Sequence, residues 1–306
     1  MSNLATRVGS LAFKNPILAA SGTAGHGAEL DAYFPLKGLG AVVVKSLSAE
    51  PWQGNPAPRV HETRVGMLNS VGLQNPGVEA WIEHELPDLQ KTGATVVASI
   101  WGFTVEAYEK AAQMLRELDD KTVVAVEVNL SCPNVESRRD MFAHSPTLTA
   151  EAIEATTAAN RPRWAKLSPN VTDLPEIAAA ARQAGAEAVT LINTVMGMAI
   201  DVNGTRKPVL GNKGGGLSGA AIHPVAVRAV YDVHAALPDL PIVGVGGVST
   251  GEEAVELMLA GASAVEVGTA TFRDPKAPAR VLKELERWCN KNGVTRVGDL
   301  RGMAHD

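Results

Sequence analysis

The stretch TVVAVEVNLSCPN, from Thr122 to Asn134, joins a run of β-branched residues to a cluster of polar side chains. The run predicts a buried strand, so the polar residues lie at its carboxyl end. Parallel α/β proteins place their chemistry at this end of their strands. A lone cysteine at such a position is more often a small buried hydrophobe than a reactive group. The role of Cys132 therefore depends on what the rest of the chain brings beside it.

The same pattern, a short apolar strand with a polar end, repeats along the chain. It predicts eight strands, at 16–20, 41–44, 96–100, 122–128, 164–167, 188–192, 241–245 and 264–267. Segments with helical periodicity lie between most of them, at 105–118, 150–159, 174–184, 221–235 and 252–259. Eight strands alternating with helices predict a closed β/α (TIM) barrel rather than an open doubly wound sheet.

The barrel is expected to form one domain over residues 1–306, because no linker rich in proline, serine or charge divides it. Residues 4–8 and 11–13 predict an N-terminal hairpin that plugs one end of the barrel. Two long insertions, 50–76 and 196–218, follow the second and sixth strands at the catalytic face. Long loops in compact domains usually carry function, so both are expected at the site.

Composition excludes several classes of partner. The formal charge of -5 and the lack of lysine and arginine clusters argue against nucleic acid and anionic membranes. No apolar run approaches the roughly 18 residues that span a bilayer, and the first residues carry no targeting pattern, so a cytoplasmic location is expected. Two distant cysteines, Cys132 and Cys289, predict neither a disulfide nor a metal or iron-sulfur site, and Cys289 is expected to be structural on a terminal helix.

Glycines follow the last two predicted strands. The run GVGGVSTG, Gly244 to Gly251, comes after strand seven, and Gly268-Thr269 comes after strand eight. In barrels these two loops commonly hold a phosphate, because glycines let backbone N–H groups approach it and a helix N-terminus adds positive potential. Ser249 breaks the dinucleotide-binding pattern G-x-G-x-x-G. A phosphorylated ligand is predicted, and tight turns without a ligand are the alternative.

Two lysines, Lys45 and Lys166, end strands where a core residue is expected. A buried lysine is unfavourable unless it meets an anion, so both are expected to face a ligand carboxylate, phosphate or electron-rich ring. The alternative is that each side chain extends to solvent.

Four asparagines are predicted at the mouth of the barrel: Asn69, Asn129, Asn134 and Asn193. Singly, each is typical of a turn. Together they offer donors and acceptors without charge, which match the alternating N–H and C=O groups of a pyrimidine or imide. The set predicts a small heterocyclic substrate.

Five motifs in order carry a resemblance to a known family: NSVGLQNP (69–76), NLSCPN (129–134), KLSPN (166–170), INT (192–194) and GVGG (244–247). They resemble the dihydroorotate dehydrogenases, which are FMN-dependent barrels of pyrimidine biosynthesis, and the resemblance covers nearly the whole chain. Cysteine rather than serine at position 132 is similar to the soluble class 1 enzymes. The runs 72–77 and 212–219 are most similar to class 1B.

The resemblance implies that dihydroorotate is oxidised to orotate. Cys132 would take the proton from carbon 5 while hydride passes from carbon 6 to FMN, and Lys166 would stabilise negative charge on the reduced ring. The substrate contacts it implies are Lys45, Asn69, Ser70, Val71, Gly72, Leu73, Asn129, Asn134, Asn193 and Thr194. The FMN contacts it implies are Ser21, Lys45, Ser46, Ser99, Asn129, Lys166, Ile192, Gly219, Gly246, Gly247, Gly268 and Thr269.

The resemblance also implies partners. Class 1B enzymes pass electrons to NAD through a second subunit that carries FAD and a 2Fe-2S cluster, and this chain has no cluster motif or dinucleotide fingerprint of its own. Members of the family generally pair as homodimers. One departure is Arg138-Arg139, where the family usually has a glycine-rich flap, and it leaves lid motion and the electron acceptor open. The alternatives are another FMN barrel acting on a related pyrimidine, a class 1A-like enzyme that uses fumarate, a phosphate-binding isomerase or lyase without flavin, and, least favoured, a non-catalytic scaffold.

Overall fold

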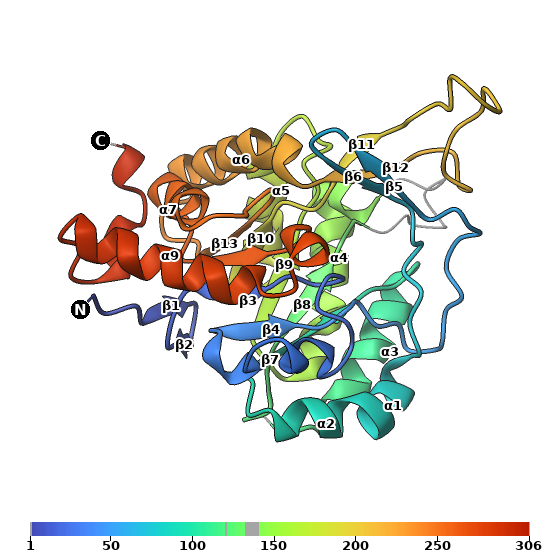
Figure 1. The fold of residues 1–306 in the computed structure, drawn as a ribbon. Coiled ribbons are helices and arrows are strands. Elements are labelled where there is room, and N and C mark those ends of the chain that lie inside the picture. The colour runs from blue at the N-terminus through green and yellow to red at the C-terminus, as the bar shows by residue number, and fades with distance from the viewer. Residues whose placement is uncertain (1, 120, 132–140, 306) are drawn as a thin grey trace.

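The computed structural model describes residues 2–119, 121–131 and 141–305. Within these ranges eight parallel strands close into a barrel with helices around it, as the sequence predicts (Figure 1). Neighbours in the chain are neighbours in the barrel, and the last strand pairs with the first. The strands are β3 (Ile17–Ala19), β4 (Ala41–Val43), β7 (Val96–Ile100), β8 (Val123–Asn129), β9 (Arg163–Lys166), β10 (Ala188–Leu191), β13 (Ile242–Val245) and β14 (Ala264–Val267).

The outer layer contains the five predicted helices, with ends that differ by a few residues. They are α3 (Val105–Leu115), α4 (Pro146–Ala155), α5 (Leu174–Gln183), α6 (His223–Ala236) and α7 (Gly251–Ala260). The hydroxyls of Thr104, Ser145 and Thr250 cap three of them, which explains where those helices begin. A terminal helix, α9 (Ala277–Lys291), carries Cys289 fully buried, as expected.

One helical segment between β4 and β7 was not predicted. It consists of α1 (Val78–Ala80), a π-helical turn η3 (Trp81–Glu85) and α2 (Leu86–Lys91). Pro87 interrupts its sequence pattern, but it stands in the first turn of α2, where proline is tolerated. Shorter elements are α8 (Ala270–Arg273), η1 (Glu29–Ala32), η2 (Leu36–Gly38), η4 (Phe142–His144), η5 (Thr156–Ala159), η6 (Ala220–Ile222), η7 (Val297–Leu300) and η8 (Met303–His305).

The predicted hairpin closes the amino end of the barrel. Strands β1 (Thr6–Val8) and β2 (Leu11–Phe13) pair antiparallel, and Val8 and Phe13 are buried against the inward residues of the barrel. The rings of Phe13 and Trp164 meet edge to face, with centroids 6.0 Å apart. With this end filled by apolar side chains, a ligand has access only from the carboxyl ends of the strands.

The two long insertions pair with each other into a second sheet. Its order is β11 (Val195–Gly197), β12 (Gly215–Ser218), β6 (Gly66–Asn69) and β5 (Val60–Thr63). A Cβ at Gly66 would lie 2.1 Å from the carbonyl oxygen of Ser218, and one at Gly215 would lie 2.4 Å from that of Asn69. The strands can approach so closely because Gly66 and Gly215 have no side chains. Glycines also interrupt the alternation of polar and apolar side chains by which a strand is recognised in a sequence.

No helix in the described ranges is both long enough and apolar enough to cross a membrane.

Candidate active site

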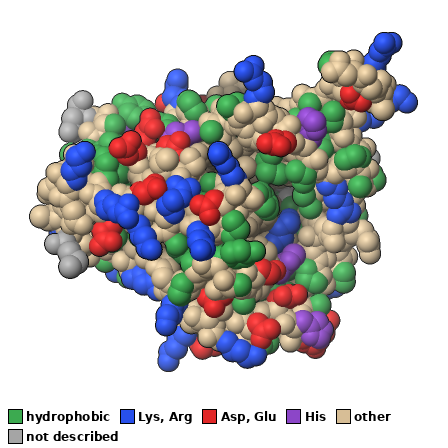
Figure 2. Space-filling model, in the orientation of Figure 1, with side chains coloured by type: hydrophobic (Ala, Val, Ile, Leu, Met, Phe, Trp, Pro, Cys, Tyr) green, Lys and Arg blue, Asp and Glu red, His purple; other side chains and the backbone are tan. Residues whose placement is uncertain are grey.

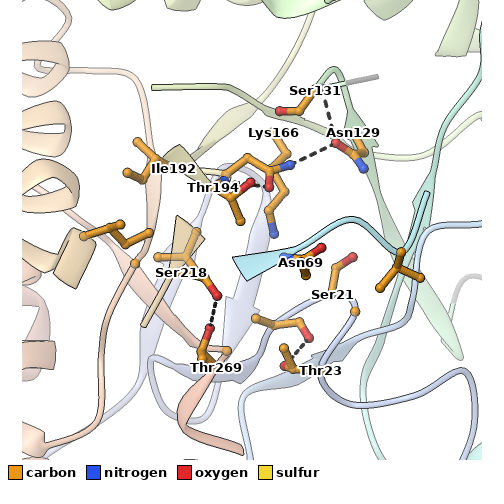
Figure 3. A pocket seen from close by; sticks show the side chains of 18 of the residues that line it. Ser21, Thr23, Asn69, Asn129, Ser131, Lys166, Ile192, Thr194, Ser218 and Thr269 are labelled. Carbon is orange, nitrogen blue, oxygen red and sulfur yellow. Dashed lines mark hydrogen bonds between the residues drawn. The ribbon is translucent and has the colours of Figure 1, made fainter. Parts of the chain in front are cut away.

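A cavity opens at the carboxyl ends of the barrel strands, and residues from all four strands of the second sheet also line it. Figure 2 shows the molecular surface hollowed beside this sheet, with hydrophobic and basic side chains at the edge. Figure 3 shows the polar groups inside, with Lys166 pointing into the space between Asn129, Asn69 and Ser21. We call it the mouth cavity.

Most of the predicted site residues line the mouth cavity. They are Ser21, Lys45, Ser46, Asn69, Ser70, Val71, Gly72, Leu73, Asn129, Lys166, Ile192, Asn193, Thr194, Gly219, Gly246, Gly247, Gly268 and Thr269. Ser99 lies behind the wall rather than on it. Cys132, Asn134 and the arginine pair 138–139 lie outside the described residues, although Ser131, directly before Cys132, is on the wall.

A chain of hydrogen bonds ties the ends of neighbouring strands together on one side of the cavity. The hydroxyl of Ser46 lies 3.3 Å from that of Ser21 and 2.9 Å from that of the fully buried Ser99. The amide of Asn129 donates to Ser46 at 3.2 Å and accepts from the amide of Asn193 at 3.2 Å. These contacts fix which face of each asparagine amide points into the cavity, so the site is organised before any ligand binds.

Lys166 sits in a buried cluster of charged groups below the cavity. Its Nζ lies 3.2 Å from an oxygen of Glu127 and 2.9 Å from an oxygen of Glu266, and both glutamates are fully buried. Burial alone would disfavour the ammonium, but the two carboxyl groups outweigh it and hold the pKa of Lys166 above its ordinary value. We call Glu127, Lys166 and Glu266 the acid-lysine cluster.

The two acids of this cluster have different surroundings. Both oxygens of Glu127 have partners, since Thr190 donates to the second at 3.0 Å. One oxygen of Glu266 has no partner among the described residues. Burial and the neighbouring Glu127 raise the pKa of Glu266 to about 8. We infer that Glu266 is protonated at neutral pH, so the ion pair within the cluster is the one between Lys166 and Glu127.

Glu127 and Glu266 were not among the predicted site residues. Each stands at an inward position of an otherwise apolar strand, in VVAVEVN and AVEV. Acidic residues are almost never fully buried without a partner. A glutamate in the middle of an apolar strand was therefore the sequence feature that could have indicated a buried charged cluster.

The loop between β6 and α1 is held over the cavity in an unusual backbone conformation. Gly72 and Leu73 have φ of 71° and 63°. A left-handed conformation is unfavourable for leucine, so other contacts must hold it. The indole of Trp52 donates to the carbonyl of Gly72 at 2.9 Å, and the amide of Asn75 donates to that of Leu73 at 2.8 Å. The loop therefore presents its backbone to the cavity in one fixed shape.

The glycine turn, Gly246–Gly247, forms another wall of the cavity with φ of 143° and 71°. A Cβ at Gly246 would lie 2.6 Å from Cβ of Ala226, and one at Gly247 would lie 2.7 Å from Cβ of His223. The start of α6 thus packs directly behind a bare backbone, an arrangement that suits an anion. Beside the turn, the hydroxyls of Thr269 and Ser218 are hydrogen-bonded at 2.8 Å (Figure 3).

Several lining residues were not predicted as site residues. The amide of Asn170 donates to the carbonyl of Thr194 at 3.0 Å and accepts from the N–H of Met196 at 2.9 Å, so it attaches β11 to the barrel. It also donates to the buried Ser168 at 2.8 Å. Ser168 and Asn170 both belong to the KLSPN motif, from which only Lys166 is predicted as a site residue.

Comparison with known proteins shows to which family the chain is similar. A family model described as "Dihydroorotate dehydrogenase" matches residues 3–288. "Dihydroorotate dehydrogenase B (NAD(+)), catalytic subunit" of Alkaliphilus oremlandii is 46% identical over 301 residues, 98% of each chain. The protein of the same name in Desulforudis audaxviator is 47% identical over 302 residues, 98% of this chain and 97% of that one. "Putative dihydroorotate dehydrogenase A (fumarate)" of Solibacter usitatus is 46% identical over 300 residues, 98% of this chain and 97% of that one.

The acid-lysine cluster predicts how stability depends on pH. The pKa of Glu266 is about 8 in the folded chain against an ordinary value of 4.5, so its bound proton stabilises the fold fully below about pH 4.5, and this gain is lost progressively as pH rises from about 4.5 to about 8. Glutamine copies the protonated acid and does not titrate. Glu266→Gln is expected to come close to the parent at pH 5 and to exceed its free energy of unfolding by about 4 kcal/mol at pH 9, measured by urea denaturation.

The matched control is Glu117→Gln, which changes an exposed glutamate just after α3. Its effect on stability should not vary with pH. If the difference between Glu266→Gln and the parent were equally independent of pH, the protonated state assigned to Glu266 would be wrong.

Proposed function

The chain belongs to the dihydroorotate dehydrogenase family and is an oxidoreductase, and on this premise we propose that it oxidises dihydroorotate to orotate with FMN bound in the mouth cavity. One observation carries the proposal: the amides of Asn129 and Asn193, the ammonium of Lys166 and the glycine turn all face a single cavity. This combination offers hydrogen bonds to a heterocycle, a buried cation and an anion site in one place.

The residues present fit FMN. The glycine turn has no room for side chains and lies against the start of α6, so its backbone can approach a phosphate closely. Gly219, Gly268 and Thr269 border the same part of the cavity and would share in holding the phosphate. Lys166 and Asn129 would face the ring. When bound, FMN supplies a ring that accepts two electrons from the substrate.

The chain's own groups recognise the substrate. Asn129 and Asn193 offer amide donors and acceptors in a fixed orientation, which suits the alternating N–H and C=O groups of dihydroorotate. Lys45 and the loop 69–73 border the cavity and would hold the substrate carboxylate and ring edge. Lys166 remains an ammonium ion and would stabilise negative charge that develops above it.

Cys132 would act as the base. Its thiolate would take the proton from carbon 5, a hydrogen would leave carbon 6 with its two electrons, and the bond between these carbons would become double. Cys132 lies outside the described residues, and Ser131, the described residue before it in the sequence, lies on the cavity wall. A free thiol has a pKa of about 8.5, so the rate is expected to rise toward alkaline pH unless the site favours the thiolate.

The first test is reduction of the bound flavin by dihydroorotate under anaerobic conditions, followed by stopped-flow absorbance. Cys132→Ala is expected to keep its yellow flavin but to slow reduction by about 100-fold or more, because it removes the base. The control is Cys289→Ala, which changes a cysteine buried in α9 and should reduce flavin at the parental rate. A colourless parent protein, or a Cys132→Ala variant with full rate, would contradict the proposal.

The second test concerns the electron acceptor. We propose that electrons pass to NAD through a partner subunit with FAD and a 2Fe-2S cluster. Two relatives are named as NAD(+) catalytic subunits, which supports NAD as the acceptor and a further subunit. A relative named for fumarate favours the competing acceptor. After reduction by dihydroorotate, the lone chain is expected not to reduce NAD until a candidate partner subunit is added, as measured by NADH absorbance. Steady turnover of the lone chain with fumarate would instead assign it to the fumarate-dependent type.

A further inference from the structure

His223 is a buried side chain that makes two polar contacts directly behind the glycine turn. It is the first residue of α6, and its ring is not part of the cavity wall. Its Nδ1 lies 2.8 Å from the carbonyl oxygen of Gly246, and its Nε2 lies 3.1 Å from a carboxylate oxygen of Glu256 on α7. The ring therefore joins the turn after β13 to the two helices that pack outside it.

The two contacts fix the orientation of the ring. A carbonyl oxygen can only accept a hydrogen bond, so Nδ1 donates to Gly246. Nε2 faces a carboxylate oxygen of Glu256, a side chain that is more than half exposed. The ring is therefore held at both nitrogens, directly behind the turn.

The position of this ring matters for an anion in the cavity. Cβ of His223 leaves no space for a Cβ at Gly247, so the residue and the turn are in close contact. Gly246 and Gly247 face the cavity on their other side. The hydrogen bond to the carbonyl of Gly246 supports the positive φ angles of the turn and draws electron density away from the peptide, which strengthens the following N–H as a donor.

We propose that His223, held by Glu256, is a positioning residue for the phosphate end of the flavin: a buried ring that donates to Gly246, shapes the glycine turn and strengthens its hold on a dianionic phosphate monoester. The inference rests on the proposed function, because it takes FMN as the ligand. It adds a phosphate-specific role for two residues that touch neither the substrate nor the cofactor. The other carboxylate at the start of α7, Glu253, is occupied by Ser249 and Thr250.

The test compares two flavins that differ only in the phosphate. The full-length chain, freed of flavin by dialysis, is titrated with FMN and with riboflavin, and binding is followed by flavin fluorescence. His223→Ala is expected to weaken FMN binding about tenfold or more and to leave riboflavin binding within about twofold, since the contact that shapes the turn around the phosphate is lost. His223→Gln keeps a donor for Gly246 and should fall between His223→Ala and the parent.

Glu256→Gln changes the partner of Nε2 and so loosens the position of the ring. It should weaken FMN binding in the same direction, by less than His223→Ala, and spare riboflavin. Equal losses for FMN and riboflavin in His223→Ala would show a merely structural role and overturn the inference, as would unchanged binding of both. A parent protein that binds FMN but is not reduced by dihydroorotate would contradict the proposed function and leave the phosphate result standing. The two failures are therefore distinguishable.

Discussion

The buried ion pair between Lys166 and Glu127 is the interaction on which the site depends. A lysine in the interior of a barrel would normally lose its charge, and two acids beside it would normally repel each other. The arrangement is stable because Glu127 accepts hydrogen bonds from the ammonium of Lys166 and the hydroxyl of Thr190, while Glu266 keeps its proton. The result is a cation fixed below the mouth cavity, with its net charge balanced from beneath rather than by the ligand. Any ligand that becomes negative above it is stabilised without movement of the protein.

Barrel closure brings this cation under residues from distant parts of the chain. Asn129 and Lys166 end adjacent strands, and their backbones are paired in register. The insertions add Asn69 and Ser218 from above, because β6 and β12 pair with each other. Strand ends supply the rigid polar wall, and the paired insertions supply the cover. Backbone pairing places each part, and side-chain hydrogen bonds such as that between Asn129 and Asn193 fix the polar groups, so the described part of the site is organised in the chain alone.

The sequence predicted the barrel because apolar runs with polar ends recur at a spacing that only a closed parallel sheet satisfies. It also predicted the residues that line the mouth, since strand-end positions follow from the strands. It did not reveal that the insertions form a sheet, because strands rich in glycine have no alternation of side chains to read. It missed Glu266 and His223 for a different reason: their roles depend on partners, Lys166 and Glu256, that are distant in the chain and become neighbours only on folding.

The central claim is that the ammonium of Lys166 stays charged at the cavity floor and favours the reduced flavin. The most direct measurement is the midpoint potential of bound FMN, by spectroelectrochemical titration, in the parent and in Lys166→Met. Removing Lys166 leaves Glu127 buried without its cation, which can make the single variant unstable. The double variant Lys166→Met with Glu127→Gln avoids this and is measured in the same way. The account predicts a shift to more negative potential in both variants, by about 30 mV or more in Lys166→Met, which is about 1.4 kcal/mol for a two-electron couple. Potentials equal to that of the parent in both variants would contradict it.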